Sequence, residues 1–171
     1  MPKHRPLRDA VQLTRNVSVR VEISTTFPAP ADDVWALVKK SKTLLFVCKG
    51  LLGFGDAKHF PQQWKEGETQ VTRLQFFNCV PAWRHSITFE KIDDNKRTLS
   101  TKEGGGLVPV WDHVIRVSPN GNQACTYLDE VEIKAGVLTV MVWLYAQILY
   151  RYRQLRWRIL LRKVLQDVTS N

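Results

Sequence analysis

Hydrophobic and polar residues alternate along several stretches of the chain, and this alternation predicts β-strands. In the first stretch, 17–26, Val19, Val21 and Ile23 are separated by polar residues. Successive side chains of a strand point to opposite faces, so this pattern is typical of a half-buried strand. Similar stretches bounded by turn residues predict further strands near 69–78, 83–93, 96–103, 108–118 and 123–134. The short connections between these later strands favour an antiparallel meander.

Other regions show the spacing of helices. Pro30 with Asp32 and Asp33 is typical of a helix N-terminus, so we expect short helices at about 30–38 and 41–48. The segment 50–67 is rich in Gly, Pro and polar residues, which predicts a loop with room for one short strand. From Val137 apolar residues recur every three or four positions without Pro or Gly, which predicts one long helix to about Val168. One face of this helix is expected to carry Met141, Tyr145, Ile148, Tyr152, Leu155 and Ile159.

The order of these elements resembles that of a known superfamily. The segments that carry the resemblance are FPAPADDVWALV (27–38) and YLDEVEIKAG (127–136). They are similar to the strand-to-helix entry and the last strand of the START/Bet v 1-like (SRPBCC) superfamily, which includes polyketide cyclase/dehydrase-like proteins. The resemblance implies an α+β helix-grip fold, in which a curved antiparallel sheet of six to seven strands wraps around a long C-terminal helix. It also implies a cavity between sheet and helix, but it does not specify an activity, because one fold hosts many functions.

Length and charge add limits to this interpretation. The 171 residues suit one domain, expected at 17–168 after a basic arm at 1–16. The net charge of +9 is concentrated at the two ends, since residues 21–150 carry 14 basic and 14 acidic side chains. A neutral body argues against a general nucleic-acid surface, so no nucleic-acid partner is expected. The chain shows no apolar signal-peptide core and no long apolar span, so we expect a cytoplasmic protein.

Four of the five predicted strands of the meander place polar residues on the same side as their aliphatic residues. Residues two apart in a strand share a face, so the aliphatic side chains identify the face turned to the helix. Ile87 and Phe89 share their face with Trp83 and His85, and Leu99 shares its face with Glu103. By the same rule, the remaining polar or aromatic residues on this face are Trp111, His113, Tyr127 and Asp129.

Two interpretations of this mixed face remain open. The polar residues could line a pocket, together with Met141, Tyr145 and Ile148 from the long helix, and orient the polar end of a ligand. They could instead form a hydrogen-bonded network that only stabilises the fold. If the site is catalytic, His113 or His85 would be the general base, with Glu103 or Asp129 fixing its tautomer.

The sequence offers little for metals, cofactors or disulfides. The three cysteines lie far apart and no CxxC motif occurs, so no disulfide framework, zinc site or cofactor is expected. Cys48 and Cys125 are expected to be small buried residues. The glycine-rich segments 53–60 and 104–106 do not open a helix after a strand, as a phosphate loop would.

The terminal helix raises the question of a partner. Its second half, RYRQLRWRILLRK (151–163), is basic, and Arg151 and Arg158 share a face. They could attract lipid phosphates or an acidic protein, or could simply be a solvated helix end. Three apolar residues lie outside the helix face that is expected to point inward, and they could contact a partner, a second subunit or a membrane surface. They are Val142, Trp143 and Leu149.

Three functions follow as hypotheses. The leading one is binding of a small hydrophobic or amphipathic molecule in the cavity, without catalysis. The second is a cofactor-free enzyme of the cyclase, dehydratase or hydrolase kind, which would need a histidine within hydrogen-bond reach of a carboxylate and a path to it. The third is a contact with a protein or membrane surface through the basic terminal helix.

Overall fold

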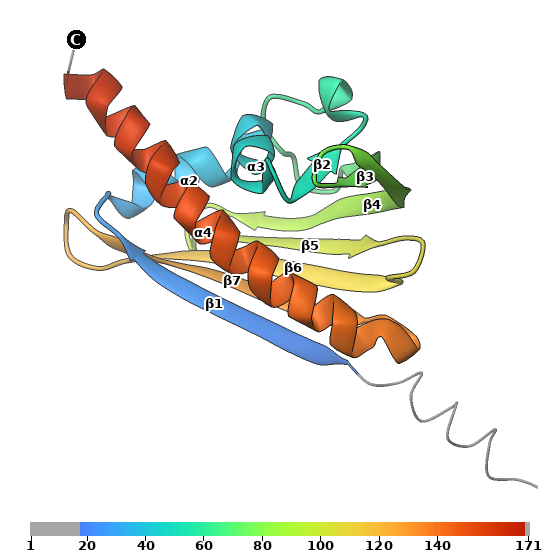
Figure 1. Cartoon of the computed structure of the whole chain (residues 1–171). Coiled ribbons are helices and arrows are strands. Elements are labelled where there is room, and N and C mark those ends of the chain that lie inside the picture. Colours follow the sequence, from blue (N-terminus) through green and yellow to red (C-terminus); the bar gives the residue numbers. More distant parts are fainter. Residues whose placement is uncertain (1–17, 170–171) are drawn as a thin grey trace, which may run out of the picture.

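The computed structural model describes residues 18–169, and Figure 1 shows their arrangement. A curved sheet of seven strands lies behind one long helix that crosses it diagonally, and two short helices lie beside this helix at one end of the sheet. The proposed arm at 1–16 lies outside the described residues. In chain order the elements are β1 (Val19–Phe27), α2 (Ala31–Val38), α3 (Ser41–Cys48), β2 (Leu52–Phe54), the 3₁₀ turn η1 (Ala57–His59), β3 (Thr69–Phe76), β4 (Val80–Asp93), β5 (Thr98–Gly104), β6 (Val110–Pro119), β7 (Cys125–Lys134), the 3₁₀ turn η2 (Gly136–Leu138) and α4 (Thr139–Thr169).

The sheet is antiparallel throughout, in the order β1-β7-β6-β5-β4-β3-β2. Strands β2 to β7 form a meander, and β1 joins its far edge by pairing with β7, so that Phe27 lies opposite Cys125. Each expected strand is present, and the short strand allowed within 50–67 is β2. Register shifts between Arg73 and Gln75 and between Phe89 and Lys91 mark bulges, which bend strands and help the sheet curve.

The helices begin where local chemistry favours them. Pro30 caps α2, and its carbonyl accepts the first helical hydrogen bond from Val34, with Asp32 and Asp33 in the first turn. Helix α3 follows after two residues and packs against α4. The α+β helix-grip arrangement expected from the sequence is therefore confirmed.

Two groups of buried residues form the interior. One lies below α2, α3 and the C-terminal half of α4 and includes Phe27, Trp35 and Trp157. The other lies between β1, β7 and the N-terminal half of α4 and includes Val21 and Ile133. Cys48 and Cys125 are buried as expected, and Cys79 is exposed.

Candidate functional site

A cavity of about 380 Å³ lies between the concave face of the sheet and α4. Most of its wall is apolar or aromatic. The β-strand part of that wall includes Leu52, Phe54, Leu74, Phe76, Ile87, Phe89, Leu99 and Ile115, and α4 adds Val142, Leu149 and Trp157. A wall of this kind, with a few polar groups, is typical of sites for small molecules.

Eight of the ten residues named from the sequence as ligand contacts line this cavity. They are Trp83, His85, Glu103, Trp111, His113, Tyr127, Met141 and Tyr145. The other two do not reach it. Asp129 is fully buried behind His113 and Tyr127, and Ile148 is 62% exposed on the outer face of α4.

The strand register explains why the polar residues converge. Glu103 on β5 is paired with Ile87 on β4, Thr101 with His113 on β6, and Ile115 with Asp129 on β7. Residues directly opposite in an antiparallel sheet share a face, so one polar position on each strand places the whole set on the concave side.

Gly106 helps to hold Trp83 in the cavity wall. It has φ of 52°, a conformation that L side chains rarely adopt, and a Cβ at this position would overlap the Trp83 indole. The glycine triplet at 104–106 therefore lets the β5–β6 connection turn tightly over this ring.

The first polar group of the wall is centred on Glu103. His85 Nε2 lies 3.2 Å from Glu103 Oε2, and the Thr101 hydroxyl donates to Oε1 at 2.6 Å. Burial alone would raise the pKa of Glu103, but the hydrogen bonds from His85 and Thr101, with the nearby histidines, hold this pKa below its usual value. Glu103 is therefore a carboxylate at neutral pH.

The second polar group is centred on Asp129. Its Oδ1 accepts hydrogen bonds from His113 Nε2 at 2.8 Å and from the Tyr127 hydroxyl at 3.1 Å, and Arg153 Nη2 lies 3.6 Å away. Burial opposes the charge, but Arg153 and His113 hold the pKa of Asp129 below its usual value. Burial would likewise lower the pKa of Arg153, yet Asp129 raises it well above the usual value. The two residues form a buried ion pair between β7 and α4.

Arg153 is further fixed by an aromatic neighbour. Its guanidinium lies over the Tyr150 ring, 4.7 Å from the ring centre, and the Tyr150 hydroxyl accepts a hydrogen bond from Trp111 Nε1 at 3.0 Å. Arg153, Tyr150 and Trp157 all line the cavity, and sequence reasoning missed all three. One signal could have found Arg153: an aspartate on the inner face of a strand needs a buried cation nearby.

The structure corrects the expected inward face of α4. Ile148, Leu155 and Ile159 are exposed, whereas Val142 and Leu149, which were expected off that face, line the cavity. Trp143, also expected off that face, packs toward β1 and donates from Nε1 to the Arg20 carbonyl. Apolar residues surround the first half of this helix on all sides, so their spacing fits two faces equally well.

The two histidine–carboxylate pairs define what the wall can do chemically. In neutral His113 and His85, Nε2 carries the proton that is donated to the carboxylate, so Nδ1 keeps the lone pair. Such a nitrogen can accept a hydrogen bond from a ligand or take a proton from it. Both histidines line the cavity, and each lies within hydrogen-bond reach of a carboxylate.

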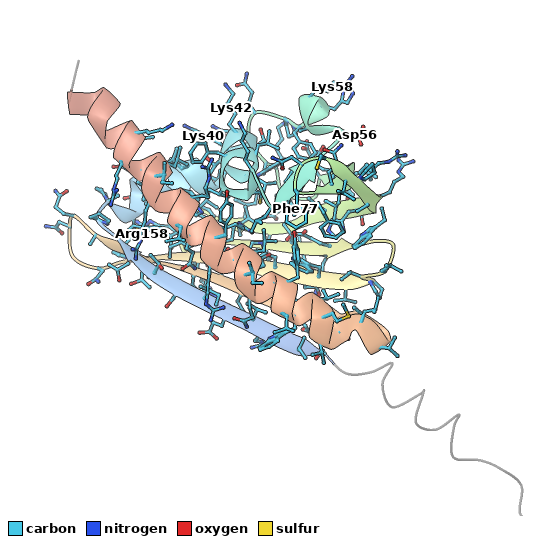
Figure 2. All side chains as sticks on the ribbon, viewed as in Figure 1. Lys40, Lys42, Asp56, Lys58, Phe77 and Arg158 are labelled. Atoms are coloured by element: carbon cyan, nitrogen blue, oxygen red, sulfur yellow. The ribbon has the colours of Figure 1, made fainter. Side chains whose placement is uncertain are left out.

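The arginines considered for a contact with a partner lie outside the cavity. Arg151 and Arg158 are exposed on α4, and Arg158 lies on the β1 side of the helix (Figure 2). Within residues 18–169, no group of three or more His, Cys, Asp or Glu side chains is arranged to hold a metal. None of the helices in this part of the chain is both long and apolar enough to cross a membrane.

Comparison with known proteins gives similarity in structure only. No family model and no curated protein matches the sequence. Norcoclaurine synthase from Thalictrum flavum is 17% identical, with a TM-score of 0.54 over 91% of this chain and 94% of that chain. The aromatase/cyclase Zhui from Streptomyces sp. R1128 is 15% identical, with a TM-score of 0.53 over 83% and 90%. A START superfamily protein from Mycobacterium smegmatis is 10% identical, with a TM-score of 0.62 over 85% and 98%.

The chain has the START/Bet v 1-like fold. The matches cover nearly the full length of the compared structures, so the chain contains the sheet, the short helices and the terminal helix of this fold. At these identities the likeness shows the fold alone.

Proposed function

We propose that the protein binds a small hydrophobic or amphipathic molecule in the cavity between the sheet and α4. The observation that carries the proposal is an apolar cavity of about 380 Å³ whose wall contains a buried arginine and two histidines, each hydrogen-bonded to a carboxylate. This volume falls within the range of ligand sites, which is roughly 300–1,000 Å³. The norcoclaurine synthase of similar fold was solved with dopamine and hydroxybenzaldehyde, which are small aromatic molecules.

Two unpaired polar atoms suggest the chemistry of the ligand's polar end. Five buried side-chain atoms have no hydrogen-bond partner among the described residues, and two of them, Trp83 Nε1 and His85 Nδ1, belong to neighbouring inward positions of β4. The other three are Asp129 Oδ2, Arg153 Nε and Trp157 Nε1. Buried polar atoms nearly always have partners, so their lack of one favours a bound group. The indole nitrogen donates, an imidazole nitrogen without a proton accepts, and a hydroxyl or phenol can both accept and donate a hydrogen bond. We therefore propose a ligand with an apolar, aromatic or aliphatic body and a hydroxyl group near Trp83 and His85.

An enzyme of the cyclase, dehydratase or hydrolase kind is the second candidate. Each histidine lies within hydrogen-bond reach of a carboxylate and reaches the cavity, which favours a general base at His113 or His85. The same two histidine–carboxylate pairs would also orient a ligand that is bound and released without reaction. Analysis of the bound molecule separates the two functions, because an enzyme returns a chemically altered molecule and a carrier returns the same one.

The cavity is tested with a probe and two tryptophan variants on one helix. Val142 lines the cavity, and Val140, two residues away, is exposed and does not. We expect the protein to bind 8-anilino-1-naphthalenesulfonate, and we expect Val142→Trp to weaken binding at least about tenfold, because the indole fills the space. Val140→Trp should bind like the unchanged protein. Equal binding by a folded Val142→Trp variant would contradict the proposal.

The natural ligand is sought by native mass spectrometry of the protein purified from its own cells. A co-isolated molecule that is lost in Val142→Trp and kept in Val140→Trp would support the cavity as its site. The mass of that molecule before and after incubation with the protein then distinguishes binding from catalysis.

A further inference from the structure

The outer face of α4 carries a row of exposed apolar side chains. Met141 and Ile148 are 70% and 62% exposed, and the row continues through Leu144, Leu155 and Ile159. Their spacing of three, four or seven residues places them on one face of the helix. The row is about 27 Å long at the rise of an α-helix. A soluble helix normally turns such a face toward the interior.

This row meets the opening of the cavity. Met141 and Leu107 both line the cavity and are both exposed, so the cavity reaches the surface between the β5–β6 turn and the start of α4. Phe77, labelled in Figure 2, is at the tip of the β3–β4 hairpin and is 61% exposed. The hairpin reaches α4 through the preceding residue, Phe76, whose ring packs edge-to-face against Tyr145. Exposed apolar side chains from α4 and the β5–β6 turn therefore border the opening, and the β3–β4 hairpin adds a further exposed aromatic ring.

Phe77 occupies a position where the backbone disfavours it. Both central residues of the turn, Phe77 and Asn78, have positive φ, at 53° and 61°, and the Cys79 amide donates to the Phe76 carbonyl. Asn and Gly are the residues that such a hairpin turn prefers, so an exposed phenylalanine costs stability here. Backbone strain of this kind is concentrated at functional sites, which favours a role for Phe77 in contact with a partner.

The charge around the row has one sign. Between Thr139 and Val164 the helix contains no acidic residue, while Arg151, Arg158, Arg162 and Lys163 are exposed. None of these four makes an ion pair with another described residue. In Figure 2, Arg158 lies on the side of α4 toward β1, and Lys42 lies at α3 on the other side.

We propose that the outer face of α4, with Phe77 and Leu107, docks on the surface of an anionic lipid bilayer, so that the opening of the cavity faces the lipid. An apolar row flanked by arginines suits the boundary between acyl chains and anionic headgroups. A second copy of this chain fits less well, because two such faces would bring like charges together. An acidic protein would match the charges, but it gives no reason for the apolar row to continue into an apolar cavity.

Flotation with lipid vesicles tests this docking. We expect the full chain to float with vesicles of phosphatidylcholine containing phosphatidylglycerol at low salt, and to float much less at high salt or with phosphatidylcholine alone. Arg151→Ala and Arg158→Ala should each weaken binding roughly fivefold. Ile148→Glu should abolish it, and Val71→Glu, at an exposed valine on β3, should not.

Phe77→Asn separates docking from folding. Asparagine accepts the positive φ of the turn, so this variant should unfold at the same or a higher temperature. We expect it nevertheless to float less than the unchanged protein. Val142→Trp, which fills the cavity, should float normally, so failure of the docking surface and failure of the proposed cavity ligand give different results.

Three results would overturn the proposal. The first is a folded protein that does not float with anionic vesicles at low salt, or that floats equally as Ile148→Glu and Val71→Glu. The second is a dimer in sedimentation that Ile148→Glu dissociates, because the occupant of the face would then be a second copy. The third is capture on immobilised polyglutamate without vesicle binding, because the occupant would then be an acidic protein.

Discussion

The pairing of Asp129 with Arg153 shows how one buried charge determines its surroundings. A carboxylate in an apolar interior is stable only if it is paired and hydrogen-bonded. Asp129 obtains these partners from three places: His113 on β6, Tyr127 on its own strand, and Arg153 on α4. The same contacts fix the orientation of His113 toward the cavity, so the ion pair connects the fold to the candidate site.

Removing one member of this pair should be far more costly than removing an exposed charge. We expect Asp129→Asn to lower the free energy of unfolding by about 3–5 kcal/mol, because Arg153 is left buried without its counter-charge. Asp112→Asn, which removes a partly exposed pair with Lys102 on the outer face, should cost less than about 1 kcal/mol. Guanidinium titration measures both values, and equal losses would show that the buried pair has no special role.

The same spacing of apolar residues can fit more than one face of a helix, and for this reason the buried face of α4 was harder to predict than the buried faces of the strands. The strands and their inward faces were predicted from alternation, because a period of two allows only two faces and the aliphatic residues mark one of them. The face of α4 was predicted wrongly, because Ile148 and Leu155 continue one apolar line and Leu149 and Trp157 belong to another. The correct line contains Arg153, and only its pairing with Asp129 in the folded chain explains a buried arginine there.

Two substitutions on α4 compare these faces directly. Trp157 is almost fully buried against Phe27 and Tyr127, and Leu155, two residues away, is exposed. We expect Trp157→Ala to lower the free energy of unfolding by about 3–5 kcal/mol, because it leaves a large void. At this chain length the loss corresponds to a fall in Tm of roughly 6–20 °C. Leu155→Ala should change Tm little, and a larger effect at Leu155 than at Trp157 would contradict the orientation of the helix.

At the scale of the whole molecule, the interior is divided between a packed core and a cavity whose wall holds charges. The bulges of the sheet curve it around α4, and side chains from both layers fill only part of the space between them. The depth of each polar residue in this space depends on that curvature. For this reason strand parity alone placed Asp129 in the cavity wall, whereas the folded sheet places it behind His113.

The buried carboxylates should make the stability of the whole protein depend on pH. Glu103 and Asp129 have folded-state pKa values below their usual values of 4.5 and 3.8, so the unfolded chain binds more protons in this range. Their contribution is fully present above about pH 4.5 and is lost as the pH falls through the lower folded-state pKa values. We expect the free energy of unfolding, measured by urea titration at a series of pH values, to decline below about pH 4.5.

Acid also raises the net positive charge, and this second effect has to be separated from the first. The chain carries 25 Lys and Arg against 16 Asp and Glu, so neutralising carboxylates increases repulsion among exposed cations. Salt screens exposed charges well and buried charges much less, so the decline that persists at high salt belongs to the buried groups. We expect this remaining decline to shrink in the double variant Glu103→Gln, Asp129→Asn and to persist in Glu22→Gln, at an exposed position on β1. The double variant alters only the two carboxylates that pair with His85, His113 and Arg153. If its free energy of unfolding falls with pH at high salt as much as that of the unchanged protein, the acid sensitivity arises from other groups.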